Sequence, residues 1–222
     1  MAAHPLIARV RPWLVWITGI LLYAGDFLIK RLPNPRTPLN VETWLDRLIP
    51  FVPLWAWVYL VLWLLYLFGA AGWYLYEHRQ DWIQVRRLLF AALFMQFGAW
   101  VIHYFFPTYM PRPVLAELQT DPHLWLIERI YSTDPPTHAL PSLHVASVTV
   151  VSWFFTLRGG WGRRLVSGVA VGLIALSTLY TKQHGVLDVI AGLAWGYLAC
   201  WVGYYTGLAW NRLPVLTAAL RG

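Results

Sequence analysis

The sequence predicts an all-α integral membrane protein, and three observations support this prediction. Of the 222 residues, 59% are hydrophobic and only 12% are charged, whereas roughly 25% are charged in an ordinary soluble domain. Long apolar runs recur between short charged or proline-rich stretches, at lengths suited to helices that cross a bilayer. Fifteen tryptophans and twelve tyrosines suit the headgroup level of a membrane, where amphipathic rings collect. We expect one domain, residues 1–222, without a sizeable soluble appendage.

Six apolar segments emerge when the charged and proline-rich stretches are used as breaks. They cover roughly residues 13–29, 51–76, 88–106, 143–157, 165–181 and 186–209. The glycine- and arginine-rich stretch 158–164 is a tight turn, so the fourth and fifth segments should form an antiparallel helical hairpin. No small-residue cleavage site follows the first segment, and we therefore interpret it as a retained anchor rather than a secretory signal.

Six spans would place both termini on one side of the bilayer, and the distribution of Lys and Arg then sets the orientation. With cytoplasmic termini, the cytoplasmic side carries ten Lys and Arg and the opposite side seven. The long third connection, about 107–142, and the fifth connection would then be extracytoplasmic. Prolines interrupt the third connection, but 124–131 resembles a short helix lying at the membrane interface. In the first connection, Asn40 is available to cap a turn through Trp44 and Leu48.

The charge, the single cysteine and the glycine spacings limit which ligands, covalent links and helix contacts we expect. The net charge of +7 fits attraction to anionic lipids or phosphate-bearing substrates, and nothing indicates a nucleic-acid-binding fold. Cys200 is the one cysteine, which excludes an intrachain disulfide and a cysteine-rich metal site. Small residues spaced Gly-x-x-x-Gly let helices approach closely, so the fifth and sixth helices should pack tightly; a homo-oligomer through these faces is the alternative. The pairs are Gly168 and Gly172, Gly192 and Gly196, and Gly203 and Gly207.

Ionisable residues at the ends of two apolar segments are the first candidates for chemistry. His184 and Asp188 open the last segment and lie four residues apart on one helix face, so the carboxylate can hold the ring's tautomer and stabilise its charged form. Ser142 and His144 open the fourth segment in a Pro-Ser-Leu-His run, at the same membrane level by the topology above. Ser142 can cap that helix, whose first N–H groups and dipole favour a bound phosphate.

A basic residue completes the candidate set. Arg112 offers a fixed fork of donors that matches a phosphate, and flanking prolines would hold it at little ordering cost. Taken alone, Arg112 and Lys182 are headgroup anchors. Together with two histidines and a carboxylate on one outer surface, they suit phosphoryl transfer, which depends on positioning and on neutralising the phosphoryl oxygens and needs no metal here.

In order, spacing and topology, these residues resemble the phosphatidic acid phosphatase type 2 (PAP2) superfamily of membrane lipid phosphatases and phosphotransferases. Its pattern has Arg-Pro after the third helix, Pro-Ser-x-His opening the fourth, and a Ser followed seven residues later by His and four later by Asp before the sixth. The pattern falls on Arg112-Pro113, on 141–144, and on Ser177, His184 and Asp188. The resemblance covers nearly the whole chain.

The resemblance implies a function and a set of roles. His184 would attack phosphorus to form a phosphohistidine, Asp188 would orient it, and His144 would protonate the leaving oxygen. The substrate, a lipid phosphate or phospholipid, would be bound through its phosphate by four residues, with no metal or other cofactor. These phosphate-binding residues would be Arg112, Ser142, Lys182 and Ser177.

Three positions depart from the phosphatase pattern. Phe105 stands where the pattern has a lysine, Thr178 where it has an arginine, and Leu143 where it has a glycine. The runs Pro-Ser-Leu-His and Thr-Lys-Gln-His look instead like the branch containing inositolphosphorylceramide synthase and related head-group transferases. In that branch Lys182 would supply a missing positive charge, and an alcohol rather than water would accept the phosphoryl group.

Two other classes of function stay open. Two histidines and a carboxylate can bind zinc or iron, so His144, His184 and Asp188 could form a metal site. A transporter is the non-enzymatic alternative, because carboxylates in membrane segments often mark ion paths, and Asp26 lies in the first segment. We interpret Asp26 as solvated near the outer surface, and His138 as a possible substrate contact.

Overall fold

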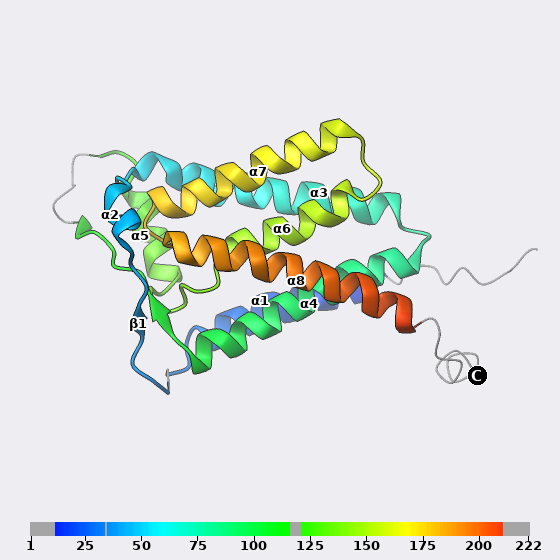
Figure 1. The fold of residues 1–222 in the computed structure, drawn as a ribbon, viewed down its shortest axis with the longest axis horizontal. Helices are drawn as coiled ribbons and strands as arrows, with labels where there is room; N and C mark the ends of the chain where they lie inside the picture. Colours follow the sequence, from blue (N-terminus) through cyan, green and yellow to red (C-terminus); the bar gives the residue numbers. More distant parts are fainter. Residues whose placement is uncertain (1–11, 34, 116–120, 211–222) are drawn as a thin grey trace, which may run out of the picture.

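The computed structural model describes residues 12–33, 35–115 and 121–210. The described part is mostly helical, and its long helices lie side by side along the longest axis of the molecule (Figure 1). Short elements gather at one end of these helices, whereas α1 begins and α8 ends at the other. The long helices are α1 (Pro12–Ile29), α3 (Trp63–Glu77), α4 (Trp82–Phe105), α6 (Leu143–Thr156), α7 (Trp161–Tyr180) and α8 (Val186–Trp210).

In the part of the chain that is described, four helical stretches are long and apolar enough to cross a membrane. They are Pro53–Glu77, Trp82–Phe105, Trp161–Tyr180 and Val186–Thr206. The first joins a 3₁₀ turn η1 (Pro53–Trp55) and a π-helical turn η2 (Val58–Leu62) to α3. Two further apolar helices are shorter, Ile17–Asp26 within α1 and Leu143–Thr156. Each predicted apolar segment thus falls on a helix, and this is a membrane protein.

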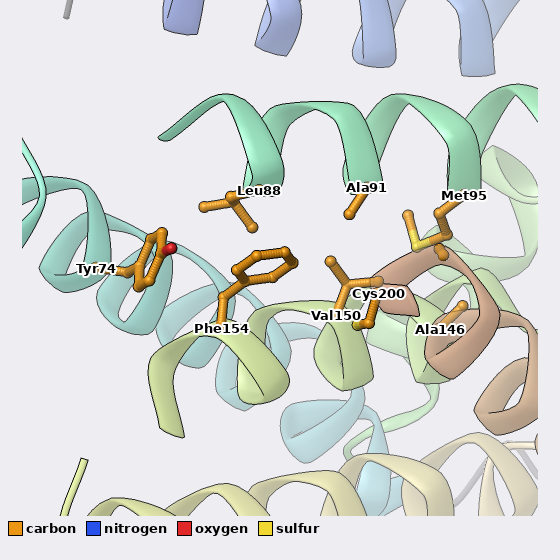
Figure 2. Close-up of a cluster of buried hydrophobic side chains, with 9 residues drawn as sticks. Tyr74, Leu88, Ala91, Met95, Ala146, Val150, Phe154 and Cys200 are labelled. Atoms are coloured by element: carbon orange, nitrogen blue, oxygen red, sulfur yellow. The ribbon is translucent and has the colours of Figure 1, made fainter. Parts of the chain in front are cut away.

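The core lies where α3, α4, α6 and α8 meet, as Figure 2 shows. Lipid tails are as apolar as leucine, so helices in a bilayer associate through close packing rather than through the hydrophobic effect. Small side chains are frequent in this cluster, which suits a close approach of the helices. The buried cluster contains Tyr74, Leu88, Ala91, Met95, Ala146, Val150, Phe154, Ala199 and Cys200.

The glycines of α8 set its packing against α6 and α4. A Cβ on Gly192 would lie 2.6 Å from the main-chain oxygen of Ser142, and one on Gly203 would lie 2.6 Å from the Cβ of Ala91. The expectation that the fifth and sixth helices pack tightly is therefore wrong, because α8 packs mainly on α4 and α6 and only marginally on α7. A Cβ on Gly168 or Gly172 of α7 would meet nothing within 4 Å.

The predicted hairpin of the fourth and fifth segments is confirmed, since α6 and α7 pack together and are joined by the short connection 157–160. The predicted interfacial helix is also present, as α5 (Leu124–Thr133). Strands β1 (Leu39–Asn40) and β2 (Thr108–Tyr109) pair in parallel and tie the first long connection to the third.

The turn in the first connection is helix α2 (Trp44–Leu48), but its cap differs from the expectation. Thr43, not Asn40, is the N-cap residue, in a capping box with Asp46. The side chain of Asn40 accepts a hydrogen bond from the main-chain N–H of Glu42 instead. The capping box satisfies otherwise unpaired main-chain donors at the helix start.

Candidate active site

A compact turn between α7 and α8 carries His184. The carbonyl of Thr178 accepts hydrogen bonds from the N–H groups of Gln183 and His184, at 3.0 and 3.2 Å. Lys182 occupies the left-handed region with φ of 51°, a conformation that is costly for a residue with a side chain. Its ammonium donates to the carbonyls of Asp46 and Ile49, both at 2.6 Å. These bonds hold the turn in one conformation.

The imidazole of His184 is oriented by a main-chain carbonyl. Its Nδ1 lies 2.9 Å from the oxygen of Ala139, and the side chain is buried. A carbonyl oxygen only accepts hydrogen bonds, so Nδ1 must carry the proton. In the neutral ring, Nε2 then holds the free electron pair that a nucleophile needs.

Asp188 lies beside this histidine but does not fix its tautomer. Its Oδ2 is 3.8 Å from Nδ1 of His184, beyond hydrogen-bond distance, and accepts the N–H of Gly185 at 2.7 Å. The carbonyl of Ala139, rather than Asp188, therefore holds the Nδ1 proton. At 3.8 Å the fully buried carboxylate can still stabilise a cationic ring by charge.

The start of α6 brings His144 to the same place. Ser142 caps this helix, and its N–H donates to the carbonyl of Asp188 at 3.1 Å. The ring centroids of His144 and His184 are 6.0 Å apart. On its other sides the His144 ring contacts the rings of Tyr59 and Trp63, with centroid separations of 4.3 and 4.5 Å.

Arg112 approaches the turn from the third connection. Its guanidinium donates to the side-chain oxygen of Gln183 at 2.6 Å and to the carbonyl of Asp134 at 2.8 Å. The guanidinium also lies 4.2 Å from the centroid of the Tyr131 ring. Burial lowers the pKa of Arg112 and the carboxylate of Asp134 opposes this, but an arginine stays charged at neutral pH.

Buried polar atoms without a hydrogen-bond partner gather around this site. In the described residues there are seven such side-chain atoms, and five belong to residues around His184. They are Nε of Arg112, both ring nitrogens of His138, Nε2 of Gln183 and Oδ1 of Asp188, while the other two are Nε of Arg87 and Nε1 of Trp153. Because a buried polar group without a partner is destabilising by about 1–3 kcal/mol, this concentration marks a place suited to a polar ligand.

Comparison with known families agrees with this geometry. A family model described as the PAP2 superfamily matches residues 36–202, about three quarters of the chain. The chain belongs to the PAP2 superfamily. Members typically catalyse phosphoryl transfer, so membership suggests phosphatase or phosphotransferase activity. No curated protein and no solved structure matches the chain significantly.

Every predicted site residue lies within the PAP2 match, but the structure does not bring all of them together. His184, Asp188, His144, Ser142 and Arg112 meet at one end of the helices, through the contacts given above. The hydroxyl of Ser177 is fully buried and donates to the carbonyl of Ile174 at 2.7 Å. The ammonium of Lys182 likewise donates hydrogen bonds to main-chain carbonyls. These contacts support the turn, and phosphate binding by Ser177 and Lys182 stays a prediction.

The structure also adds residues to this PAP2 site that the sequence analysis did not single out. Gln183 pairs with Arg112, and Tyr59 and Asp134 lie behind His144. Asp46 of α2 is buried, and its Oδ1 accepts the N–H of Val186, the first residue of α8, at 2.7 Å. Gln183 could have been found from the sequence, because it is next to His184. Tyr59 could not, because it lies within an apolar segment whose pattern predicts contact with lipid.

The remaining candidates are placed as follows. His138 is buried near His103, with ring centroids 5.3 Å apart. Burial lowers the pKa of His138, so this ring is neutral near pH 7. Asp26 accepts hydrogen bonds from Gln96 and Trp100 and pairs with Lys30. Among the described residues, no group of three or more His, Cys, Asp or Glu side chains is arranged to hold a metal ion.

Proposed function

We propose that this protein transfers a phosphoryl or phospho-head group from a lipid phosphate through a phosphohistidine on Nε2 of His184. One observation carries the proposal. The Nδ1 proton of His184 is held by the Ala139 carbonyl, so its Nε2 is free to attack, and the His144 ring centroid lies 6.0 Å from that of His184. The partly buried Arg112 supplies a positive charge beside them, through its contact with Gln183.

In the first step, the Nε2 electron pair of His184 forms a bond to phosphorus while the bond from phosphorus to the leaving oxygen breaks. His144 enters this step as the imidazolium and gives its Nε2 proton to the leaving oxygen. The phosphorylated His184 ring is cationic and keeps its Nδ1 proton. The Ala139 carbonyl and the Asp188 carboxylate stabilise that charge.

In the second step, neutral His144 accepts a proton from the attacking group as that group bonds to phosphorus. The bond from phosphorus to nitrogen breaks, and His184 returns to its neutral form. If the attacking group is water, the product is free phosphate and the protein is a lipid phosphatase. If it is an alcohol, the protein is a phosphotransferase.

Phosphate binding in this proposal rests on buried donors. Arg112 Nε and Gln183 Nε2 are buried donors without a partner, and phosphate oxygens would satisfy both. The N-terminus of α6 at Ser142 adds main-chain N–H groups and a favourable dipole. Ser177 and Lys182 complete the proposed phosphate-binding set, Lys182 through its charge.

We further propose six spans, cytoplasmic termini and an extracytoplasmic active site. The six apolar helices alternate in direction, and the start of α1 and the end of α8 lie away from the site end (Figure 1). The third connection contributes Arg112 and α5 to the site end. The open glycine face of α7 at Gly168 and Gly172 is the proposed surface for a homo-oligomer.

A head-group transferase of the inositolphosphorylceramide synthase type is the second candidate. Thr178 is fully buried and its hydroxyl donates to the carbonyl of Ala175, so this position supplies no basic phosphate ligand. Leu143, where the phosphatase pattern has glycine, is partly buried and packs on the core of α3, α4, α6 and α8. This second candidate rests on these departures from the phosphatase pattern, and in it an alcohol accepts the phosphoryl group.

The test uses the purified full-length protein in detergent micelles. Radiolabelled phosphatidic acid, an isoprenyl diphosphate, and phosphatidylinositol with ceramide are supplied in turn, and the label is followed into free phosphate or into a new lipid. Release identifies a phosphatase and movement a transferase. If no substrate turns over and the protein instead moves ions or lipids across vesicles, the transporter alternative replaces this proposal.

A matched pair of variants makes this test specific. His184→Ala should abolish turnover in a protein that stays folded. His78 is equally buried, and its Nδ1 lies 2.9 Å from the carbonyl of Tyr74 at the other end of the helices. His78→Ala should therefore retain turnover. Full activity of His184→Ala would contradict the proposed function.

A further inference from the structure

A chain of side chains runs from the end of α1 to the second histidine of the site. Lys30 Nζ lies 2.9 Å from Oδ1 of Asp134, and Oδ2 of Asp134 lies 3.5 Å from the Tyr59 hydroxyl. That hydroxyl lies 3.2 Å from Nδ1 of His144. The three residues come from distant parts of the sequence, yet together they lead to one ring nitrogen.

The direction of these hydrogen bonds follows from the chemistry of their ends. An ionised carboxylate only accepts, so the single hydroxyl proton of Tyr59 points to Asp134. The Tyr59 oxygen must then accept from His144, which places a proton on Nδ1 of His144. Nε2 of His144 is therefore the atom that exchanges a proton with the substrate.

Lys30 keeps the far end of the chain ionised. Burial alone would raise the pKa of the Asp134 carboxyl, but the charge and hydrogen bond of Lys30, together with the charges of His144 and His184, outweigh burial and lower the pKa to about 2. Burial also works against the Lys30 ammonium, but Asp134 and Asp26 together raise its pKa. Lys30 contacts Asp26 at 2.6 Å. Both ends of the Lys30–Asp134 pair are thus charged near pH 7.

We propose that Tyr59, Asp134 and Lys30 are positioning residues that fix the orientation and tautomer of His144. The inference rests on the proposed acid role of His144. Lys30 precedes residue 36, where the PAP2 match begins, so α1 extends the site beyond the matched region. Asp26 thereby gains a role as second partner of Lys30 rather than as part of an ion path.

Tyr59→Phe is the sharpest probe, because it removes the hydroxyl and keeps the ring that contacts His144. Tyr66→Phe is its matched control. Tyr66 is also buried in the same helical stretch, and its hydroxyl bonds to Ser152 and Ser167, away from the site. Both variants lose one buried hydroxyl, so a general loss of packing or stability should affect them alike.

Two measurements separate this inference from the proposed function. NMR of isotopically labelled imidazole nitrogens, with His144→Ala for assignment, reports the tautomer without any substrate. Tyr59→Phe should lose the Nδ1–H preference of His144, and Tyr66→Phe should keep it. An unchanged His144 tautomer in Tyr59→Phe overturns the inference, even if the protein proves to be an active phosphotransferase.

The second measurement is kinetic and compares leaving groups. Phosphatidic acid leaves an alkoxide that needs a proton, whereas an isoprenyl diphosphate leaves a phosphate that needs one much less. Tyr59→Phe should lower kcat for phosphatidic acid by about tenfold, with KM and the diphosphate rate within about twofold. An equal loss for both substrates would mark a merely structural role. If wild type turns over neither substrate, the proposed function fails, and the NMR result alone decides the positioning chain.

Substitutions of Asp134 and Lys30, which lie further from His144, should change the tautomer of His144 to different extents. Asp134→Asn introduces an amide that can donate to Tyr59, which frees the hydroxyl proton to point at His144 and reverses the tautomer. Lys30→Met keeps the length of the side chain and removes its charge. We expect the tautomer change to be largest in Asp134→Asn and smaller in Lys30→Met. A Lys30→Met effect larger than that of Asp134→Asn would contradict this order.

Discussion

His184 and His144 face each other across the site, but they are held in opposite ways. The ring of His184 is anchored by a main-chain carbonyl, that of Ala139. The ring of His144 is anchored by a side-chain hydroxyl, that of Tyr59, with Asp134 behind it. A main-chain anchor cannot be removed by a substitution at its own position, whereas a side-chain anchor can be tuned. The nucleophile keeps its Nδ1 proton through the cycle, whereas the acid must give up and regain the proton on its Nε2.

Replacing each histidine should give the largest effects and expose this difference. His184→Ala removes the nucleophile, so all substrates should lose turnover by at least about a thousandfold. His144→Ala removes only the proton donor, so the loss should be about 10²–10⁴-fold for phosphatidic acid and much smaller for an isoprenyl diphosphate. Steady-state rates of the two variants on both substrates check this. An equal loss with every substrate in His144→Ala would argue against its acid role.

Arg112 touches both anchoring systems, since its guanidinium donates to Gln183 beside His184 and to the carbonyl of Asp134. Arg112→Lys keeps the charge but loses the fork of donors. We expect kcat/KM to fall by roughly tenfold on any substrate, in keeping with about 1.4 kcal/mol of lost binding. Arg79→Lys is a suitable control, because Arg79 is exposed at the other end of the helices. A wild-type rate in Arg112→Lys would remove Arg112 from the phosphate site.

Asp46 supports the His184 side alone. Its carboxylate accepts the N–H of Val186 and the N–H and hydroxyl of Thr43, so Asp46→Ala leaves these partly buried donors unpaired, at a cost of at most about 1–3 kcal/mol each. The melting temperature should fall, and kcat should fall several-fold because the turn carrying His184 loosens. The tautomer of His144 should be unchanged. A changed His144 tautomer in Asp46→Ala would show that the two anchors are not independent.

Acid titration tests the side-chain anchor of His144, and we expect it to give the smallest effect of these experiments. The pKa of Asp134 is lowered to about 2 in the folded protein, against about 3.9 for an unperturbed aspartate. The Lys30–Asp134 pair therefore stabilises the fold above about pH 4 and loses this contribution as the pH falls towards about 2. Asp134→Asn should be less stable than wild type near pH 7, with a gap that narrows below about pH 4. Denaturation midpoints across this range check the sign, and a gap that widens in acid would contradict it.

The sequence was sufficient to predict part of this site because the chemistry follows local spacing. A histidine and an aspartate four apart on a helix, and a serine at a helix start, keep their relation in any fold that preserves those helices. The apolar segments were predictable for the same reason. Arg112 was predictable as a phosphate ligand by residue type, but its partner Gln183 required the turn between α7 and α8 to be seen.

The rest depended on tertiary structure that spacing does not encode. Tyr59 lies among apolar residues, and only the packing of η2 against α6 gives its hydroxyl a histidine to contact. The contact of the Ala139 carbonyl with His184 could not be predicted from residue type, because every residue has a main-chain carbonyl. The glycine spacings indicated close packing but not the partner, so α8 was assigned to α7 rather than to α4 and α6.

The most direct test of the central claim is to trap and locate the phosphorylated residue. The full-length protein is mixed briefly with radiolabelled phosphatidic acid or isoprenyl diphosphate, quenched in alkali, where phosphohistidine survives, and mapped by mass spectrometry. We predict label on His184, attached at Nε2, which accumulates in His144→Ala with the isoprenyl diphosphate, because its leaving group needs little protonation while the acceptor step is slowed. Turnover without label on His184, or label on another residue, would contradict the account.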